Sequence, residues 1–360
     1  MKSGTKVCFF VNDVSLSGGV ERVCSVIANG LAERNFNVYI ISLTHRNDTK
    51  FYELHKSIKV FTLYSSLGRG VFRFFPTILK LRKILNSKKI DTLIDVESML
   101  ALYSTFAVPF LKVKHLVWEH FNYTVTLGKR SRFLARILSG MFADNVITLT
   151  DKDKRLWLSK HFWLRSSIRS IPNPVTLSNN IKTQRNPQKI FLAVGRLTYQ
   201  KGFDTLLSSW AKIHKKIPDW KLHIVGDGEC LDSFQEFIEV NGLEDRVELI
   251  QHSLSIEEHY RKAGYIVLTS RFEGLPLVLI EAQSLGVPAI AFDCNTGPSD
   301  ILNNSGWLVE DQNSEELQTV MVSAAEAFDS PEYNKLQLQS KWISEKYKLE
   351  PILDIWEKIV

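Results

Sequence analysis

Long apolar runs, paired cysteines and internal repeats are all missing from this 360-residue sequence. No stretch reaches eighteen consecutive apolar residues, about the length that a membrane-spanning helix needs. The N-terminal run in MKSGTKVCFFVND is also too short for the core of a signal peptide. Four scattered cysteines, with no CxxC pair, offer no metal-ligand spacing, so we expect a protein of a reducing compartment, the cytoplasm.

The composition is that of a globular enzyme of more than one domain. Hydrophobic residues make up 44% and charged residues 23%, which excludes a disordered chain. A chain of 360 residues usually needs two hydrophobic cores. The net charge of +6 and the pI near 9.0 favour anionic partners such as nucleotides or phospholipid headgroups. Nucleic acid is not expected, because no recognised nucleic-acid module appears.

Short apolar strands alternate with amphipathic helices in both halves of the chain. KVCFFVND, a glycine-bearing loop, a helix and NVYIISL open the first half as a βαβ unit, and the alternation restarts at IFLAVG. The pattern predicts an α/β protein with two doubly wound, Rossmann-like domains facing a central cleft. The expected parts are a domain over residues 1–174, a linker over 175–188, a second domain over 189–332 and a helical tail over 333–360 that packs back on the first domain.

Two cations follow the strand IFLAVG, in the loop RLTYQKG. Arg196 and Lys201 there lie beside a predicted helix start, which favours an anion site. Two solvated surface cations are the equally plain alternative. A Walker loop is excluded, because GxxxxGK[ST] is absent.

Glycines mark two further strand ends. Gly226 and Gly228, in the stretch GDGE, would let the backbone approach a flat ligand, although an ordinary strand-to-helix turn explains them too. Leu231 stands where a GxGxxG motif needs its third glycine, so a dinucleotide site is weakly supported. Gly18 and Gly19 precede a helix, where their amides would suit a phosphate.

The stretch SRFEGLPLVLIEAQSLG raises the question of why a carboxylate lies in an apolar helix. Glu281 follows four apolar residues and needs a partner if it is buried. A ribose diol would supply two donors, whereas an internal arginine or a backbone amide is the structural alternative. Glu273, at the end of the preceding strand, is expected to point toward the same cleft.

RFEGLPLVLIEA resembles the E-x7-E signature of the retaining glycosyltransferases of family four, which have the GT-B fold. SGGVE, VWEH, GRLTYQKG, GDGE and NTGPSDIL resemble further motifs of that family in the same order. The likeness covers nearly the whole chain and is strongest from about residue 190 to 302. It departs from the family at Thr296-Gly297-Pro298, where many relatives carry two glycines.

The resemblance implies a role for each matching residue. Arg196 and Lys201 would bind the donor's diphosphate and stabilise the leaving group. Glu273 would contact the transferred sugar, Glu281 would hold the nucleotide ribose, and His120 would lie beside the transferred sugar. The remaining donor-site positions implied by the match are Gly18, Gly19, Gly226, Asp227, Gly228, Gly274 and Leu275.

No metal or cofactor is expected, because the cationic pair would stabilise the leaving diphosphate. The one literal DxD, Asp151-Lys-Asp153, opens a predicted helix. Thr150 and Asp153 are better interpreted as a helix cap than as metal ligands.

Two basic, aromatic segments, residues 69–89 and 129–142, lie in the predicted acceptor domain. Phe72, Phe75, Ile78, Leu79 and Leu81 would enter a bilayer surface, while the neighbouring cations Arg73, Lys80, Arg82 and Lys83 would meet anionic headgroups. The alternative is a pair of core helices with solvated basic faces.

Together with these patterns, the resemblance implies a metal-independent, retaining transferase that uses a nucleotide sugar, most simply a UDP-hexose or UDP-N-acetylhexosamine. Its acceptor would be a growing, lipid-linked surface glycan such as lipopolysaccharide, O-antigen, capsule or exopolysaccharide. The protein would lie peripherally on the inner face of the cytoplasmic membrane. The alternatives are a sugar-nucleotide epimerase or hydrolase on the same frame, and a non-catalytic binding protein of GT-B fold.

Overall fold

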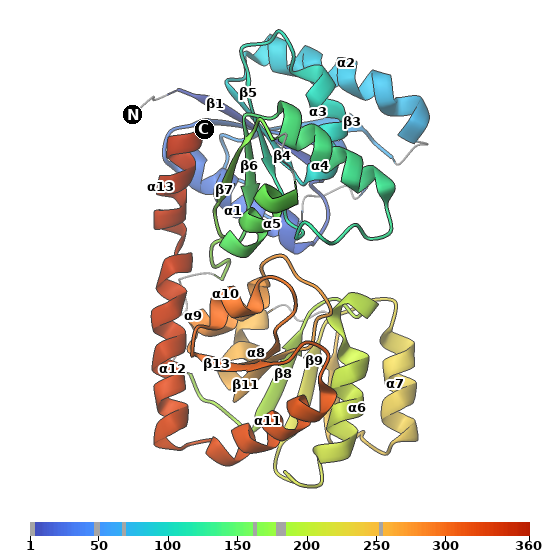
Figure 1. Ribbon diagram of the computed structural model, residues 1–360, viewed down its shortest axis with the longest axis vertical. Coiled ribbons are helices and arrows are strands. Elements are labelled where there is room, and N and C mark those ends of the chain that lie inside the picture. The colour runs from blue at the N-terminus through green and yellow to red at the C-terminus, as the bar shows by residue number, and fades with distance from the viewer. Residues whose placement is uncertain (1–3, 47–50, 67–69, 161–163, 178–184, 252–254) are drawn as a thin grey trace. The chain divides into compact units, whose positions relative to one another are not determined.

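The chain divides into two compact units in the computed structural model, which describes residues 4–46, 51–66, 70–160, 164–177, 185–251 and 255–360 (Figure 1). The N-terminal unit comprises Met1–Thr176 and Leu349–Val360, and the C-terminal unit comprises Leu177–Lys348. Part of the predicted linker, residues 178–184, lies outside the described residues. Of the predicted tail over 333–360, only the part from Leu349 onward belongs to the N-terminal unit, whereas residues 333–348 belong to the C-terminal unit.

A parallel sheet forms the centre of the N-terminal unit. In the described residues its strand order is β3-β2-β1-β4-β5-β6-β7, and every pairing is parallel, with Val7 opposite Val38 on one side and Thr92 on the other. The strands are β1 (Lys6–Asp13), β2 (Asn37–Thr44), β3 (Lys59–Tyr64), β4 (Thr92–Val96), β5 (Lys114–Trp118), β6 (Asn145–Thr148) and β7 (Ser167–Ser170).

Helices cover both faces of this sheet (Figure 1). Alternate residues of β1 separate the faces, because Cys8 and Phe10 belong to the apolar cluster that Leu81 and Leu85 of α2 complete. The helical segments are α1 (Gly19–Glu33), α2 (Gly70–Lys88), η1 (Ser98–Leu100), α3 (Ala101–Ala107), α4 (Arg130–Phe142), α5 (Asp151–Lys160) and α13 (Leu349–Ile359).

The last helix, α13, is anchored to α1 by charge and by shape. Arg34 forms ion pairs with three acids of α13, namely Glu350, Asp354 and Glu357. Leu353 packs directly over Gly30, where an added Cβ would lie 2.5 Å from its side chain. The chain end is therefore an integral part of the N-terminal core.

The C-terminal unit is built on a second parallel sheet. In the described residues its order is β10-β9-β8-β11-β12-β13. All pairings are parallel. The strands are β8 (Ile190–Val194), β9 (Lys221–Val225), β10 (Val247–Ile250), β11 (Tyr265–Leu268), β12 (Ala289–Phe292) and β13 (Gly306–Val309).

Its core combines aliphatic and large aromatic side chains. Phe191 of β8 and Trp210 of α6 lie 6.0 Å apart between ring centroids and are fully buried with Leu222 and Val267. The helical segments are η2 (Tyr199–Lys201), α6 (Phe203–Ile213), α7 (Leu231–Val240), α8 (Ile256–Lys262), α9 (Leu277–Ser284), α10 (Pro298–Leu302), α11 (Ser314–Ala327), α12 (Pro331–Ser344) and η3 (Glu345–Tyr347).

Each sheet has one point at which the chain reverses the direction in which it adds strands. In the N-terminal unit this switch point lies between β1 and β4, and in the C-terminal unit it lies between β8 and β11. Ligands of open α/β sheets bind at the carboxyl ends of the strands at such a point. The predicted doubly wound α/β architecture is confirmed, and it directs attention to the loops after these four strands.

Candidate functional site

An ion pair spans the switch point of the C-terminal unit. Lys201, in the loop after β8, places its Nζ 2.6 Å from Oε1 of Glu273, in the loop after β11. The side chains are only 17% and 8% exposed, so the pair is partly withdrawn from water. The structure thus brings together two predicted site residues that are 72 positions apart.

Glycine and threonine fix the turn that carries Lys201. Gly202 has a left-handed φ of +64°, and a Cβ added there would lie 2.1 Å from the carbonyl oxygen of Thr269. The Thr269 hydroxyl donates to the carbonyl oxygens of Gly202 at 3.0 Å and of Lys201 at 3.2 Å. Only glycine fits so close to β11, and this contact places the Lys201 ammonium over the strand ends.

Arg271, in the loop after β11, also binds the segment after β8. Its backbone N–H donates to Gln200 O, and its guanidinium binds both carboxylate oxygens of Asp204 at 2.9 and 2.7 Å. The guanidinium also lies 4.0 Å from the ring centroid of Tyr199. Sequence reasoning missed these contacts of Arg271, because a lone arginine after a strand does not indicate its partner.

Arg196, the second predicted cation, is exposed. Within the part of the chain that the structure describes, its guanidinium has no ion pair or hydrogen bond. It lies in the same loop after β8 as Lys201, so two cations follow this one strand. The prediction that Arg196 binds a diphosphate remains a prediction.

The GDGE glycines are explained by close approach to the neighbouring backbone. A Cβ on Gly226 would lie 1.9 Å from Gly195 O, and one on Gly228 would lie 2.5 Å from Leu197 O. Leu197 N donates to Asp227 O at 2.9 Å, which completes the contact between the loops after β8 and β9. The structural alternative accounts for both glycines without a ligand, and a donor-binding role for residues 226–228 stays a prediction.

Glu281 is buried in α9, with an exposed fraction of 3%. Its Oε2 accepts a hydrogen bond of 2.9 Å from the hydroxyl of Tyr260 on α8. One partner of Glu281 is therefore a tyrosine, which sequence reasoning did not name. No sequence signal links Tyr260 to α9, and the predicted ribose contact of Glu281 is untested.

The loop with the unusual Thr-Gly-Pro sequence supports Glu273 through its backbone. The Thr296 hydroxyl donates to Glu273 O at 2.7 Å. Gly297 has a φ of +101°, and a Cβ there would lie 2.5 Å from the Pro276 ring. Gly274 and Leu275, predicted donor-site positions, lie in the segment that this loop holds.

In the N-terminal unit, Gly18 caps α1 and Gly19 is its first residue. Asp13, at the end of β1, fixes the start of the preceding loop. Its carboxylate accepts hydrogen bonds from the Ser15 backbone at 3.0 Å and from the Thr44 hydroxyl at 3.1 Å. The two glycines thus follow the β1 side of the switch point, as expected for a phosphate-facing loop, although no contact tests that role.

His120 follows β5 and is buried, with its ring 4.5 Å from that of Trp118. Burial lowers its pKa to about 4, so the imidazole is neutral at pH 7. Its Nε2 has no hydrogen-bond partner among the residues that the structure describes. A buried imidazole nitrogen without a partner is uncommon and is consistent with a ligand-binding role.

A buried charge cluster lies next to His120. Glu119 accepts hydrogen bonds from Arg136 Nε at 3.0 Å and from Phe121 N at 3.1 Å, while Arg132 pairs with Glu97. Burial alone would raise the pKa of Glu119, but Arg136 and Arg132 hold it below its ordinary value. Glu97 was missed, although a carboxylate directly after an apolar strand is a signal of a strand-end site.

The two basic segments are only partly as predicted. In the segment 129–142, Arg132 and Arg136 are buried in the charge cluster, so they cannot meet headgroups. In the segment 69–89, of which residue 69 lies outside the described residues, Ile78 and Leu81 are buried core residues. The prediction was wrong for Ile78 and Leu81, because one face of α2 packs on the sheet while only the opposite face reaches solvent.

The other side chains named in the α2 prediction differ from one another in exposure and in hydrogen-bond partners. Phe72, Phe75 and Leu79 are exposed by 76%, 72% and 67%. The cations Arg73, Lys80 and Arg82 donate to backbone carbonyl oxygens of the same unit. Lys83 is exposed, and its contact with headgroups stays a prediction.

The DxD stretch has a structural function at the start of α5. Asp153 N donates to the Thr150 hydroxyl at 3.0 Å, which confirms Thr150 as a cap. The Asp153 carboxylate accepts a hydrogen bond of 2.7 Å from Tyr123 N. Among the described residues, no three His, Cys, Asp or Glu side chains are grouped so that they could hold a metal ion.

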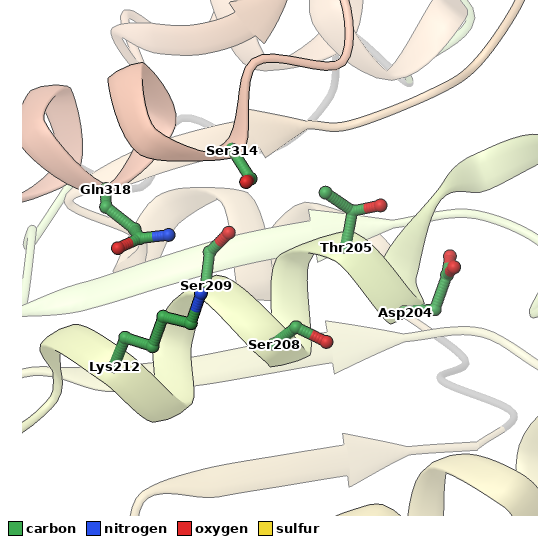
Figure 2. A pocket seen from close by; sticks show the side chains of 7 residues that line it. All are labelled: Asp204, Thr205, Ser208, Ser209, Lys212, Ser314 and Gln318. Atoms are coloured by element: carbon green, nitrogen blue, oxygen red, sulfur yellow. The ribbon is translucent and has the colours of Figure 1, made fainter.

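A polar cavity of about 180 Å³ lies between α6 and α11, away from the predicted residues. Figure 2 shows side chains of α6 facing Ser314 and Gln318 of α11. None of the predicted site residues lines it, so the cavity does not coincide with the switch point. The full lining is Asp204, Thr205, Ser208, Ser209, Lys212, Ser314 and Gln318.

Comparison with known proteins places this geometry in a family. Residues 17–179 match the model for Glycosyltransferase Family 4, and residues 177–335 match the model for Glycosyl transferases group 1. The amylovoran biosynthesis glycosyltransferase AmsD of Erwinia amylovora is 33% identical over 99% of both chains. An N-acetylgalactosaminyltransferase of Campylobacter jejuni subsp. jejuni, whose name gives a PP-undecaprenol-linked glycan, is 27% identical over 99% of this chain and 98% of that protein.

A solved structure supports the same assignment at the level of the fold. A mutant of S. aureus TarM, in complex with fondaparinux, α-GlcNAc-glycerol and UDP, has a TM-score of 0.81 over 99% of both chains at 16% identity. The two doubly wound units, the ordered motifs and the full-length relatives agree. The chain therefore belongs to the family-4-type glycosyltransferases with the GT-B fold.

Proposed function

We propose that this glycosyltransferase moves a hexosyl or N-acetylhexosaminyl group from a UDP-sugar to a glycan hydroxyl, with retention at C1 and without a metal ion. The observation that carries the proposal is the Lys201–Glu273 pair at the β8/β11 switch point, with Arg196 in the same loop. The UDP in the TarM complex favours a uridine nucleotide as the carrier of the sugar.

The leaving diphosphate gains negative charge as the sugar–phosphate bond breaks. Lys201 is held at the strand ends before any ligand arrives, and a fixed ammonium stabilises that charge without reorganisation. Arg196 can add a planar guanidinium suited to two phosphate oxygens. These two cations would supply the charge stabilisation that a divalent metal provides elsewhere.

Glu273 has a double function in this proposal. Its carboxylate orients the Lys201 ammonium at 2.6 Å, and it lies where it can accept hydrogen bonds from sugar hydroxyls. Glu281 would bind the ribose from α9 while keeping its bond to Tyr260. His120, neutral at pH 7, would act as a hydrogen-bonding group toward the transferred sugar rather than as a cation.

The epimerase, hydrolase and non-catalytic alternatives are less well supported. The matching family models and the full-length relatives are all described as glycosyltransferases. Both cations and both acids of the donor motifs are present in this chain. The acceptor class that fits these relatives is a lipid-linked bacterial surface glycan.

A donor screen tests the proposal. UDP-, GDP- and ADP-linked sugars are added in turn, and thermal stabilisation, release of the nucleoside diphosphate and the anomeric configuration of any product are measured. Stabilisation and turnover with a UDP-sugar, and an anomer matching the donor, are expected. Turnover only with GDP- or ADP-sugars, or an inverted product, would contradict the stated donor or mechanism.

We also propose that the protein binds the membrane surface through an apolar patch on α2 and α3. The α2–α3 patch comprises side chains of α2, of α3 and of the loop that follows α3, each at least half exposed. They are Phe72, Phe75, Leu79, Phe106 and the loop residue Phe110. Phe74 links the two helices, because its ring lies 5.4 Å from Phe75 and 6.0 Å from Phe106. Among the described helices none is long and apolar enough to cross a bilayer.

Vesicle binding tests this patch. Transfer of large apolar side chains from water into the headgroup region is favourable. Phe72→Ser/Phe75→Ser should therefore bind anionic vesicles at least about fivefold more weakly than wild type. Binding should also fall with salt, since exposed cations such as Lys83 contribute. Leu338→Ser/Trp342→Ser, which removes exposed apolar side chains of α12, is the matched control. The membrane role of the patch would be refuted if only the control variant bound anionic vesicles more weakly. It would also be refuted if wild type bound neutral and anionic vesicles equally.

A further inference from the structure

Glu97 adopts a backbone conformation that glycine would adopt more easily. It directly follows β4 and has a φ of 97° and a ψ of 135°. A residue with a Cβ is strained at such a φ, and strained residues collect at functional sites. A glutamate at this position therefore needs a reason other than the turn itself.

The location of Glu97 supplies a reason for this strained glutamate. The β1/β4 junction is the switch point of the N-terminal unit, and Glu97 lies at its β4 side. From the β1 side, the Asn12 amide donates to Glu97 Oε2 at 3.3 Å. The backbone N–H of Glu97 donates to Trp118 O at 2.9 Å, which links it to β5. An amide and a carboxylate thus meet where an open α/β sheet binds its ligand.

The neighbouring charges distinguish Glu97 from a purely structural acid. Glu119, the other carboxylate of the cluster, is fully buried and is held by Arg136 and the Phe121 backbone. Glu97 pairs with Arg132 but keeps 14% of its side chain exposed. Burial raises the pKa of Glu97 and Arg132 opposes that shift, so its proton affinity is higher than that of Glu119. Glu119 is thus part of the core, whereas Glu97 reaches the edge of the sheet.

We propose that Glu97, assisted by Asn12, binds a hydroxyl of the acceptor glycan's terminal sugar. The carboxylate accepts a hydrogen bond from the sugar hydroxyl, and the Asn12 amide provides a donor beside it. Arg132 and Asn12 hold the Glu97 side chain in place, which explains why the strained backbone is retained. The inference rests on the proposed function, because it assigns the acceptor side of that reaction to the N-terminal unit.

The test separates donor from acceptor. UDP release from the UDP-sugar that wild type uses is measured in water and with octyl glycosides of glucose, galactose, N-acetylglucosamine and N-acetylgalactosamine. At least one octyl glycoside should stimulate release by wild type. Glu97→Gln should need at least about tenfold more of that glycoside for half-maximal stimulation, because a charged hydrogen bond to the hydroxyl is lost. Its UDP affinity should stay within about twofold of wild type.

Asp91→Asn is the matched control, since Asp91 precedes the same strand β4 and binds Lys6 N at 2.8 Å at the opposite edge. It should respond to the glycoside as wild type does. If Glu97→Gln does not fold, Asn12→Ala leaves the Glu97–Arg132 pair intact and should weaken the glycoside response by about threefold.

Three results would overturn the inference: an unchanged glycoside response in the Glu97 and Asn12 variants, an equal loss of UDP affinity, or no glycoside stimulating wild type. Failure of the proposed function looks different, because wild type would then neither bind UDP nor release it from any UDP-sugar.

Discussion

Glu281 and Glu273 belong to one motif but have different surroundings. Glu281 is buried in α9 and bonded to Tyr260, whereas Glu273 lies in a loop and pairs with Lys201. A carboxylate inside an apolar helix is costly unless polar partners satisfy it. Tyr260 provides one such partner. The proposed ribose would add its hydroxyls. The two acids should therefore respond to different parts of the donor.

Glu281→Ala should weaken UDP binding by about 1–3 kcal/mol, because the ribose hydroxyls lose a charged acceptor. The measurement is a titration of wild type and variant with UDP and with 2′,3′-dideoxy-UDP. Wild type should discriminate between the two nucleotides by about that amount, and the variant should bind them equally. A variant that still prefers UDP to the same extent would show that Glu281 serves only the fold.

His120 predicts an acid-sensitive contribution to stability. Its pKa is about 4 in the folded protein and near 6.5 when unfolded, so the unfolded chain binds the proton first as the pH falls. The stability contribution is thus complete above pH 6.5 and is lost toward pH 4, with about 2 kcal/mol lost at pH 5. Chemical denaturation at pH 7 and pH 5 should show a smaller loss in His120→Gln than in wild type. Equal losses would refute the depressed pKa.

Sequence reasoning identified residue types at strand ends but not their partners. Arg196, Lys201, Glu273 and Glu281 were selected because charge follows or interrupts apolar segments. Lys201 and Glu273 are 72 positions apart and meet only because the strands before them are adjacent, which no local pattern encodes. Glu97 was overlooked although it directly follows an apolar strand, and its unusual backbone angle leaves no trace in the sequence.

The short turn before α6 connects the fold to the chemistry. Gly202 ends η2, and its lack of a side chain lets Lys201 approach β11. Gly202→Ala should cost at least about 2 kcal/mol, from the left-handed φ and from the clash with Thr269 O. UDP affinity should fall as well, because the ammonium would move.

Gly242 provides the control for this turn. It has a φ of +60° but open space where a Cβ would lie, so Gly242→Ala meets the same backbone penalty without the clash. Thermal unfolding and UDP titration of both variants separate the two effects. Equal destabilisation of the two variants, with unchanged UDP affinity in Gly202→Ala, would contradict the proposed role of the turn.

Regular elements were predictable where their patterns were strong. KVCFFVND forms β1 over the expected residues, since a continuous apolar run ending in polar residues is typical of a buried parallel strand. The edge strands β3 and β13 were not identified, because Lys59–Tyr64 and Gly306–Val309 are short and only partly buried. The division between α12 and α13 was also missed, because a continuous helical pattern does not reveal which core each part joins.

In the chain as a whole, a pair of polar side chains at the switch point of a sheet occurs twice. Each unit places two polar side chains at its switch point, from the carboxyl ends of the two strands or from the segments that follow them. These are Asn12 with Glu97 in one unit and Lys201 with Glu273 in the other. Doubly wound topology explains this repetition, because two strands whose connections diverge leave their carboxyl ends uncovered. The proposed division of labour assigns the donor to the C-terminal unit and the acceptor to the N-terminal unit.

The most direct measurement is the dissociation constant of UDP for wild type and for Arg196→Ala/Lys201→Ala, by calorimetric titration. Loss of two phosphate-binding cations should weaken binding at least about a hundredfold. Lys212→Ala, in the cavity between α6 and α11, should leave it unchanged. Unchanged affinity in the double variant, or a loss only in Lys212→Ala, would contradict the assignment of the donor diphosphate to the β8/β11 switch point.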